Sequence, residues 1–406
     1  MAPFNLPGLK AGLMLSAAAL LAGIYSCTDI PAVHREPFMA AGVDGQGEPD
    51  IRVLIDNGSQ IVVGVRGSFQ VQDPESGALI GGNRDGAAPL PVRGLAGRLS
   101  WEVLGSAAPA SVDIVVTAGG AILVGTEAFF DTVRLAGTKD GVMAINILPM
   151  ERYLCGVITG ELGDGPVEAL KAQAVAARTY ALYEYKSRAS QPYHLRRTAA
   201  SQVFHSASGY GHTVTRAAAE TRGLVLTTGG RLFKAYFSST CGGTTANIDD
   251  VWDCLPQAVY TTVPCGYCDG TKFATWTKSF SKSDLKRLLA KDGFRAGAVQ
   301  RVEVLPAGRG TSGRVRSVNI FVDDQSYSGL IVVSGLRLRG ILGEYNLKST
   351  WFDVTDTGRE VVFSGRGYGH GVGLCQVGAL AMGEDGLTFI EILNRYYVGA
   401  DITRLY

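Results

Sequence analysis

The chain has 406 residues, which is enough for two or three domains and a sizeable hydrophobic core. Thirty-eight Lys and Arg against 37 Asp and Glu leave a net charge of +1, which excludes binding of nucleic acid or an anionic membrane through bulk charge. Hydrophobic residues make up 46% and charged residues 18%, which excludes a disordered chain. Glycine, with 53 residues, is about twice as frequent as usual, so these glycines need a structural explanation.

The first 26 residues are predicted to be an export signal. Lys10 precedes an apolar run over residues 11–24, which is too short to span a bilayer. Ser26 and Cys27 resemble the end of a lipoprotein signal, in which the cysteine is lipidated and becomes the new N-terminus. The alternative is an uncleaved segment that lies at the membrane interface. We therefore expect an exported protein of the cell envelope that contacts a membrane only through an N-terminal lipid.

Residues 27–48 are predicted to be a linker or tether, because they carry Pro, Gly and polar residues without a period. Residues 49–145 are predicted to be mostly β-structure. Short β-branched runs at 51–55, 61–63, 112–116 and 121–124 are separated by Gly, Asn and Asp turns. This stretch lacks a cluster of His, Cys or carboxylates, so we expect it to be a scaffold or a wall of the substrate site.

A helix is predicted to begin after Pro149, since proline suits the first turn of a helix. Leu154, Val157 and Ile158 recur at helical spacing, and the next position of this apolar stripe is Glu161. A carboxyl group against apolar surface has a raised pKa, which suits a general acid at neutral pH. Glu161 is therefore a candidate catalytic residue. The alternative is that the helix frays and Glu161 faces water.

A second helix is predicted from Gly165–Pro166 to about Tyr185, with an alanine-rich sequence that allows close helix packing. Gln173 lies on its apolar side, where an amide needs a partner. Arg178 could balance Glu161 or contact a ligand. The alternative for both residues is an ordinary core helix with polar flanks.

A glycine-rich strip near the C-terminus carries glycine at every second position: Gly365, Gly367, Gly369, Gly371 and Gly373. It fits neither the dinucleotide fingerprint nor the P-loop, so nucleotide binding is not expected. Alternate glycines let a bulky ligand or another backbone lie close to the chain. Polar groups in or next to the strip, namely Tyr368, His370 and Gln376, are candidate substrate-binding residues.

Four cysteines fall within 28 residues: Cys241, Cys254, Cys265 and Cys268. In an exported protein disulfides are the stronger expectation. Zinc is the alternative, although only one pair of these cysteines has the close spacing that zinc sites usually show twice. Cys155 lies beside the apolar helix stripe and is expected to be a buried thiol. No cofactor is expected to be required.

Four ordered segments resemble the stage II sporulation protein D (SpoIID/LytB) family of bacterial cell-wall proteins. They are ERYLCGVITGELGDGPVEALKAQAVAARTYAL (151–182), YFSSTCGGTTANIDDVW (236–252), SGLRLRGILGEYNLKSTWF (334–352) and a segment from GRGYGHGVGLCQVGAL onward (365–402). The resemblance covers residues 49 to 406 and implies that Glu161 is the catalytic acid. It also implies that Gln202 is a polar site position and that the glycine-rich strip lines a glycan groove beside Glu161.

The resemblance implies a lytic transglycosylase that cleaves the bond between N-acetylmuramic acid and N-acetylglucosamine in peptide-stripped peptidoglycan. One carboxyl group suffices for this chemistry, because the C6 hydroxyl of the sugar attacks in place of water. Two alternatives stay open. One is a non-catalytic enhancer that holds the cell wall or a partner amidase, and the weaker one is a muramidase with a second carboxylate. A zinc site that some members carry just before the Gln202 position is not expected, because only His194 is present there.

The expected fold is α+β, with helices and strands segregated along the chain. Short strands fill the N-terminal third, a helical catalytic segment follows, and the glycine-rich strip lies near the C-terminus. Residues 146–406 are predicted to form the catalytic core that resembles the SpoIID family.

Overall fold

The computed structural model describes residues 47–105, 108–117, 119–295, 297–324 and 327–406. The predicted export signal, Cys27 and nearly all of the linker lie outside these residues. The α+β fold is confirmed: strands dominate the first part, and the helices gather in later segments. In the part of the chain that the structure describes, no helix has the length and apolar character needed to cross a membrane.

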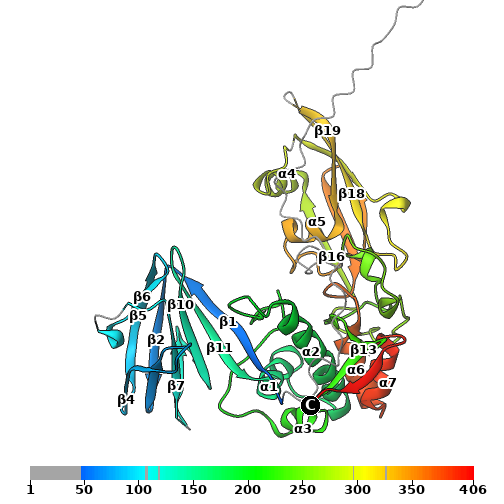
Figure 1. Ribbon diagram of the computed structural model, residues 1–406. Helices are drawn as coiled ribbons and strands as arrows, with labels where there is room; N and C mark the ends of the chain where they lie inside the picture. Colours follow the sequence, from blue (N-terminus) through cyan, green and yellow to red (C-terminus); the bar gives the residue numbers. More distant parts are fainter. Residues whose placement is uncertain (1–46, 106–107, 118, 296, 325–326) are drawn as a thin grey trace, which may run out of the picture.

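The N-terminal part is built from two sheets that share one hydrophobic core, drawn in blue and cyan in Figure 1. Alternate side chains of β7 show why these residues form strands, since Val112 and Ile114 are fully buried and their neighbours are not. The larger sheet consists, in order, of β12 (Leu195–Arg196), β1 (Asp50–Gly58), β11 (Val142–Pro149), β10 (Thr132–Gly137), β7 (Ser111–Val116), β3 (Phe69–Gln72) and β4 (Leu79–Asn83). The smaller sheet consists of β6 (Arg98–Ser100), β5 (Ala87–Leu95), β2 (Gln60–Arg66), β8 (Ala121–Val124) and β9 (Glu127–Phe129).

A helical lobe follows directly from this β-structure, because β11 runs into the first helix at Pro149. Its helices are α1 (Met150–Glu161), α2 (Val167–Ser187), α3 (His212–Glu220), α6 (Gln376–Glu384) and α7 (Phe389–Tyr396). Its short strands are β13 (Leu224–Thr228), β14 (Arg231–Leu232), β15 (Phe237–Ser238), β22 (Leu374–Cys375) and β23 (Asp401–Arg404). The buried helix α2 contacts the four other helices, so the C-terminal segment completes the lobe that the first helices begin (Figure 1).

Residues 275–366 form a third lobe with a hydrophobic core of its own, drawn in yellow and orange in Figure 1. Two three-stranded sheets make it up: β16 (Thr275–Ser281), β21 (Glu360–Arg366) and β20 (Phe352–Asp356), and β17 (Val299–Glu303), β18 (Ser317–Asp324) and β19 (Tyr327–Ser334). Its helices are α4 (Lys282–Lys291) and α5 (Gly335–Leu342). Buried residues of 146–406 fall into three hydrophobic clusters: the cluster shared with the N-terminal part, the cluster of the third lobe and a small one between α1, α2 and α3.

Four short 3-10 helices complete the described secondary structure: Glu102–Leu104, Ile248–Asp250, Ala258–Tyr260 and Pro306–Gly308. The segment around Ile248–Asp250 lies beside the third lobe, where it lines a pocket together with residues of β19 and α5.

Candidate functional site

Glu161 is the last residue of α1, and its side chain is only partly exposed. Val203 N–H donates a hydrogen bond to Glu161 Oε1 over 2.7 Å, and Gln376 Nε2 donates to Glu161 Oε2 over 3.2 Å. Val203 follows Gln202 in a loop, whereas Gln376 is the first residue of α6. The carboxyl group is therefore fixed by donors from two distant segments of the chain.

Two glycines of α1 allow the 202–205 loop to reach Glu161. A Cβ atom placed on Gly160 would lie 2.5 Å from Val203 O, and one on Gly156 would lie 2.6 Å from His205 O. Real Cβ atoms do not approach that closely, so side chains here would push the loop away. The contact is reinforced by His205 N–H, which donates to Gly156 O over 3.2 Å.

Burial raises the pKa of the Glu161 carboxyl above its usual value. The hydrogen bonds from Val203 and Gln376 and the charge of the nearby His205 act in the opposite direction, but burial prevails. The alternative in which α1 frays and Glu161 faces water is therefore wrong. A partly desolvated carboxyl group that keeps its proton more readily than usual is suited to donate it to a leaving group.

Sequence reasoning did not identify Val203 and His205 as site residues. Val203 acts through its backbone N–H, which carries no residue signature. His205 is exposed and lies close enough to influence Glu161 electrostatically. His205 lies only three residues after Gln202, a predicted site residue, and this proximity could have marked it as a site residue.

Gln202 is fully buried, and both ends of its amide are used within the protein. Tyr153 Oη donates to Gln202 Oε1 over 2.8 Å, and Gln202 Nε2 donates to Ala177 O over 3.3 Å. Gln202 therefore anchors the loop against α1 and α2, and it does not face a ligand. Gln173 is also fully buried on α2, and neither of its amide atoms has a hydrogen-bond partner among the described residues.

Arg178 pairs with Glu151 and not with Glu161, contrary to one expectation for this residue. Its Nε and Nη2 atoms donate to the two carboxylate oxygens of Glu151 over 2.9 and 2.6 Å. Its Nη1 atom donates to Leu224 O over 3.0 Å, and the side chain is fully buried. Arg178 thus connects α2 to the start of α1 and to β13 inside the core.

The glycines of the C-terminal strip face protein and not open space. Four of them have positive φ values between 71° and 101°, so the strip is not a regular extended strand: Gly367, Gly369, Gly371 and Gly373. Added Cβ atoms there would collide with the 236–241 segment or with the guanidinium group of Arg314. Of the two roles expected for this strip, the structure shows close approach of another backbone. The strip nevertheless leads through β22 to Gln376, which reaches Glu161.

His370 packs against the rings of Tyr236 and Trp252, with centroid distances of 5.8 and 5.2 Å. Its Nδ1 accepts a hydrogen bond from Val372 N–H over 3.1 Å. Burial, together with the charges of two arginines, lowers the pKa of His370 to about 3, so the imidazole is neutral at physiological pH. Tyr368 is partly exposed and its ring meets Phe273 edge to face.

Three of the four clustered cysteines lie together, but the fourth member differs from the prediction. Cys241, Cys265 and Cys268 are joined by Cys375, and Cys254 is not part of the group. None of the described cysteines, Cys254 included, forms a disulfide, so the disulfides favoured for this stretch are not present in the structure. Cys155 is buried as expected, and burial raises its pKa to about 11.

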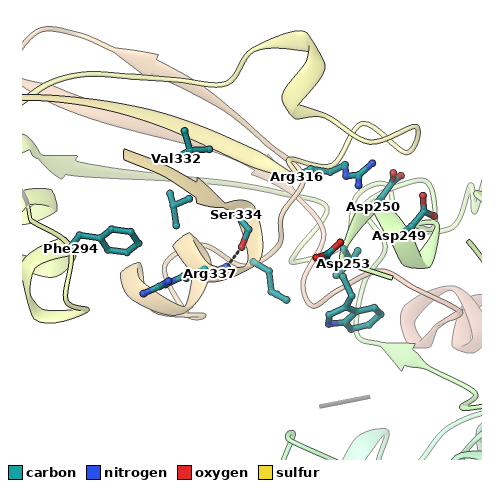
Figure 2. Close-up of a pocket in the computed structure, with 12 residues that line it drawn as sticks. Asp249, Asp250, Asp253, Phe294, Arg316, Val332, Ser334 and Arg337 are labelled. Atoms are coloured by element: carbon teal, nitrogen blue, oxygen red, sulfur yellow. Dashed lines mark hydrogen bonds between the residues drawn. The ribbon is translucent and has the colours of Figure 1, made fainter. Parts of the chain in front are cut away.

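Two pockets lie elsewhere, and neither is lined by Glu161. One, of about 390 Å³, lies between the 249–253 segment and the third lobe. Figure 2 shows Asp249, Asp250, Asp253 and Arg316 on one side of it, and Phe294 and Val332 on the other. The second pocket lies between α1 and α3 and is lined by Glu151, Cys155 and Tyr210 among others.

Comparison with known proteins gives two family matches and several relatives. A family model described as stage II sporulation protein matches residues 138–228, which include Glu161. A second model, described as a domain of unknown function, matches residues 267–373, which include the third lobe.

The relatives share about 30% identity with the chain. Stage II sporulation protein D of Bacillus amyloliquefaciens is 30% identical over 281 residues, which cover 64% of this chain and 76% of the relative. The amidase enhancer of Bacillus subtilis is 30% identical over 289 residues, covering 62% of this chain and 40% of that longer protein. An uncharacterized protein of Brachyspira hyodysenteriae is 30% identical over 288 residues, covering 70% of this chain and 75% of the relative. The chain belongs to the stage II sporulation protein D family.

Proposed function

We propose that the protein is a lytic transglycosylase that cleaves the glycosidic bond between N-acetylmuramic acid and N-acetylglucosamine in peptidoglycan, with Glu161 as its acid and base. The observation that carries this proposal is the state of Glu161, which is partly buried, has a raised pKa and accepts two hydrogen bonds. Among the described residues, no other carboxylate shares a hydrogen bond with it. One carboxyl group in this environment suits a reaction that needs only one.

In the proposed reaction, protonated Glu161 gives its proton to the glycosidic oxygen as the bond to the muramic acid C1 breaks. The C6 hydroxyl of the same sugar then attacks C1, and the Glu161 carboxylate takes the proton of that hydroxyl. The product is a 1,6-anhydro sugar, and no water is consumed. Hydrogen bonds from Val203 and Gln376 would stabilise the carboxylate between the two proton transfers, because both donors are already in place.

The substrate contacts belong to this proposal as well. Gln376 donates a hydrogen bond to the catalytic carboxyl group and so orients Glu161 toward the substrate. Tyr368, which is partly exposed, is the candidate for direct contact with the substrate. We also propose an exported location in the cell envelope, with lipidation at Cys27.

The test is digestion of peptide-stripped glycan strands by the purified full chain, followed by mass spectrometry. The expected products are about 18 Da lighter than those of hydrolysis, because no water is added. Glu161→Gln should abolish product formation and keep binding to the strands. Glu384→Gln, an exposed acidic residue on α6, serves as the matched control and should retain activity. Hydrolytic products would favour a muramidase and refute the transglycosylase.

A second candidate function is enhancement of a cell-wall amidase, since one relative bears the name amidase enhancer. In that case the chain would sediment with peptidoglycan and stimulate an added amidase, but it would release no glycan fragments. Glu161→Gln would then leave the stimulation unchanged, which separates the two functions.

A further inference from the structure

Four cysteines from three separate segments meet in the interior of the helical lobe. Cys241 follows β15, Cys265 and Cys268 form a CxxC turn, and Cys375 ends β22. All four are buried, with at most 1% of each residue exposed. Cys268 Sγ lies 3.4 Å from Cys241 Sγ, 3.9 Å from Cys265 Sγ and 3.5 Å from Cys375 Sγ. All four sulfur atoms lie within 4.8 Å of one another.

These separations fit the corners of a tetrahedron around one metal ion. Zinc binds thiolates at about 2.3 Å, which places the sulfur atoms of a tetrahedral site about 3.8 Å apart. A disulfide would require about 2.05 Å, which is much shorter than any of the three measured distances. A cluster of several irons would require a wider spacing of the four sulfurs. The geometry therefore favours a single ion with four thiolate ligands.

Hydrogen-bond donors surround the sulfur atoms, as they do in metal–thiolate sites. The backbone N–H groups of Cys241 and Gly378 point to Cys375 Sγ, over 3.3 and 3.4 Å. Tyr396 Oη lies 3.2 Å from Cys265 Sγ. Gly378 has to be a glycine here, because its Cβ would lie 2.7 Å from Cys265 Sγ and would collide with the Tyr396 hydroxyl.

A buried arginine beside the cysteines offers the charge that such a site needs. Arg314 is fully buried, and its Nη2 atom donates to Cys241 O over 2.9 Å. Among the described residues, no carboxylate forms an ion pair with Arg314. The nearby Asp250 accepts its hydrogen bonds from the N–H groups of Thr311 and Ser312 instead. Four thiolates with one divalent cation carry a net charge of −2, which would compensate the guanidinium in this low-dielectric interior.

We propose that Cys241, Cys265, Cys268 and Cys375 bind one zinc ion in a closed, structural four-thiolate site. The ion ties β15, the CxxC turn and the start of α6 together. Because Gln376 directly follows Cys375 and donates to Glu161 Oε2, the ion also fixes the position of that donor. Gln376 is then a positioning residue for Glu161. This role rests on the proposed function, whereas the proposal of a zinc site does not.

The first experiment measures the metal content of the purified full chain by mass spectrometry of the elements. We expect about one zinc per chain. Replacement of zinc by cobalt(II) should give the intense sulfur-to-cobalt charge-transfer absorption and the visible bands of a tetrahedral four-thiolate site. Iron in place of zinc would overturn the choice of metal. A metal-free chain in which the four cysteines form two disulfides would overturn the site.

The second experiment compares two cysteine substitutions. Cys268→Ser removes the sulfur that contacts the other three and should lower the zinc content roughly tenfold. Cys155→Ser changes a buried thiol outside the group and should keep the full zinc content. If Cys268→Ser fails to fold, the cobalt spectrum of the unmodified chain still decides the question. A chain with one zinc but without glycan cleavage would keep the metal site and refute the transglycosylase.

Discussion

Substitution of Gly160 by alanine tests whether the close approach of the 202–205 loop to α1 defines the Glu161 site. The new Cβ would lie 2.5 Å from Val203 O, so the loop would have to give by about 0.9 Å to reach an ordinary contact distance. A shift of that size is enough to stretch the 2.7 Å bond between Val203 N and Glu161 Oε1 beyond hydrogen-bond range.

The expected change in the free energy of unfolding of Gly160→Ala is the sum of opposing contributions. Overpacking costs about 1–3 kcal/mol, and loss of a hydrogen bond to a carboxylate costs about 1.5–3 kcal/mol when the group is ionised. Alanine in place of a helical glycine returns at most about 1 kcal/mol. We therefore expect Gly160→Ala to lower the free energy of unfolding by roughly 2 kcal/mol and to reduce cleavage of glycan strands.

Gly340→Ala is the matched control, because Gly340 is exposed on α5 and nothing lies within 4 Å of its added Cβ. This variant should gain about 0.5–1 kcal/mol, the opposite sign. Denaturant titration of both variants measures the difference in the free energy of unfolding. If Gly160→Ala is as stable as Gly340→Ala and fully active, the position of the 202–205 loop does not require a glycine at residue 160. That result would refute the reasoning.

Three further predictions concern charge and capping. The raised pKa of Glu161 means that its stabilising contribution is complete below its ordinary value and is lost as the pH rises through the raised value. Glu161→Gln should therefore increase the urea midpoint near pH 7 but not near pH 4, and equal gains at both pH values would contradict the pKa direction. Glu151→Gln leaves the buried Arg178 without its counter-charge and should cost about 3–5 kcal/mol in urea denaturation, whereas a cost below about 1 kcal/mol would show that the pair is dispensable. Thr388→Ala removes the capping box that Thr388 forms with Glu391 at the start of α7, and it should cost about 1 kcal/mol by the same measurement, with no change arguing against the cap.

Local patterns in the sequence predicted the α+β class, several of its elements and the position of the candidate residue Glu161 on an apolar helix stripe. Short β-branched runs between turn residues predicted N-terminal strands such as β7, because strand propensity and turn chemistry are local properties of the chain. The apolar stripe of α1 likewise pointed to Glu161, because helical spacing places it beside Ile158 and Leu154 on the buried side. The predicted starts after Pro149 and Pro166 also match, since α1 begins at Met150 and α2 at Val167.

Contacts between distant segments could not be predicted in the same way. The donors to Glu161 come from 42 and 215 residues away, and no periodicity relates positions so far apart. The same limitation led to Cys254 being grouped with the cysteines near it in sequence, when Cys375 completes the group in space. Tertiary packing also decided the role of the C-terminal glycines, which let one backbone lie on another. Local sequence thus indicated many of the helices and strands and placed Glu161 on the apolar stripe of its helix, because these features depend on neighbours along the chain. The atoms around the Glu161 carboxyl group and the meeting of the four thiols follow from tertiary packing, because segments far apart in the chain come together within the helical lobe.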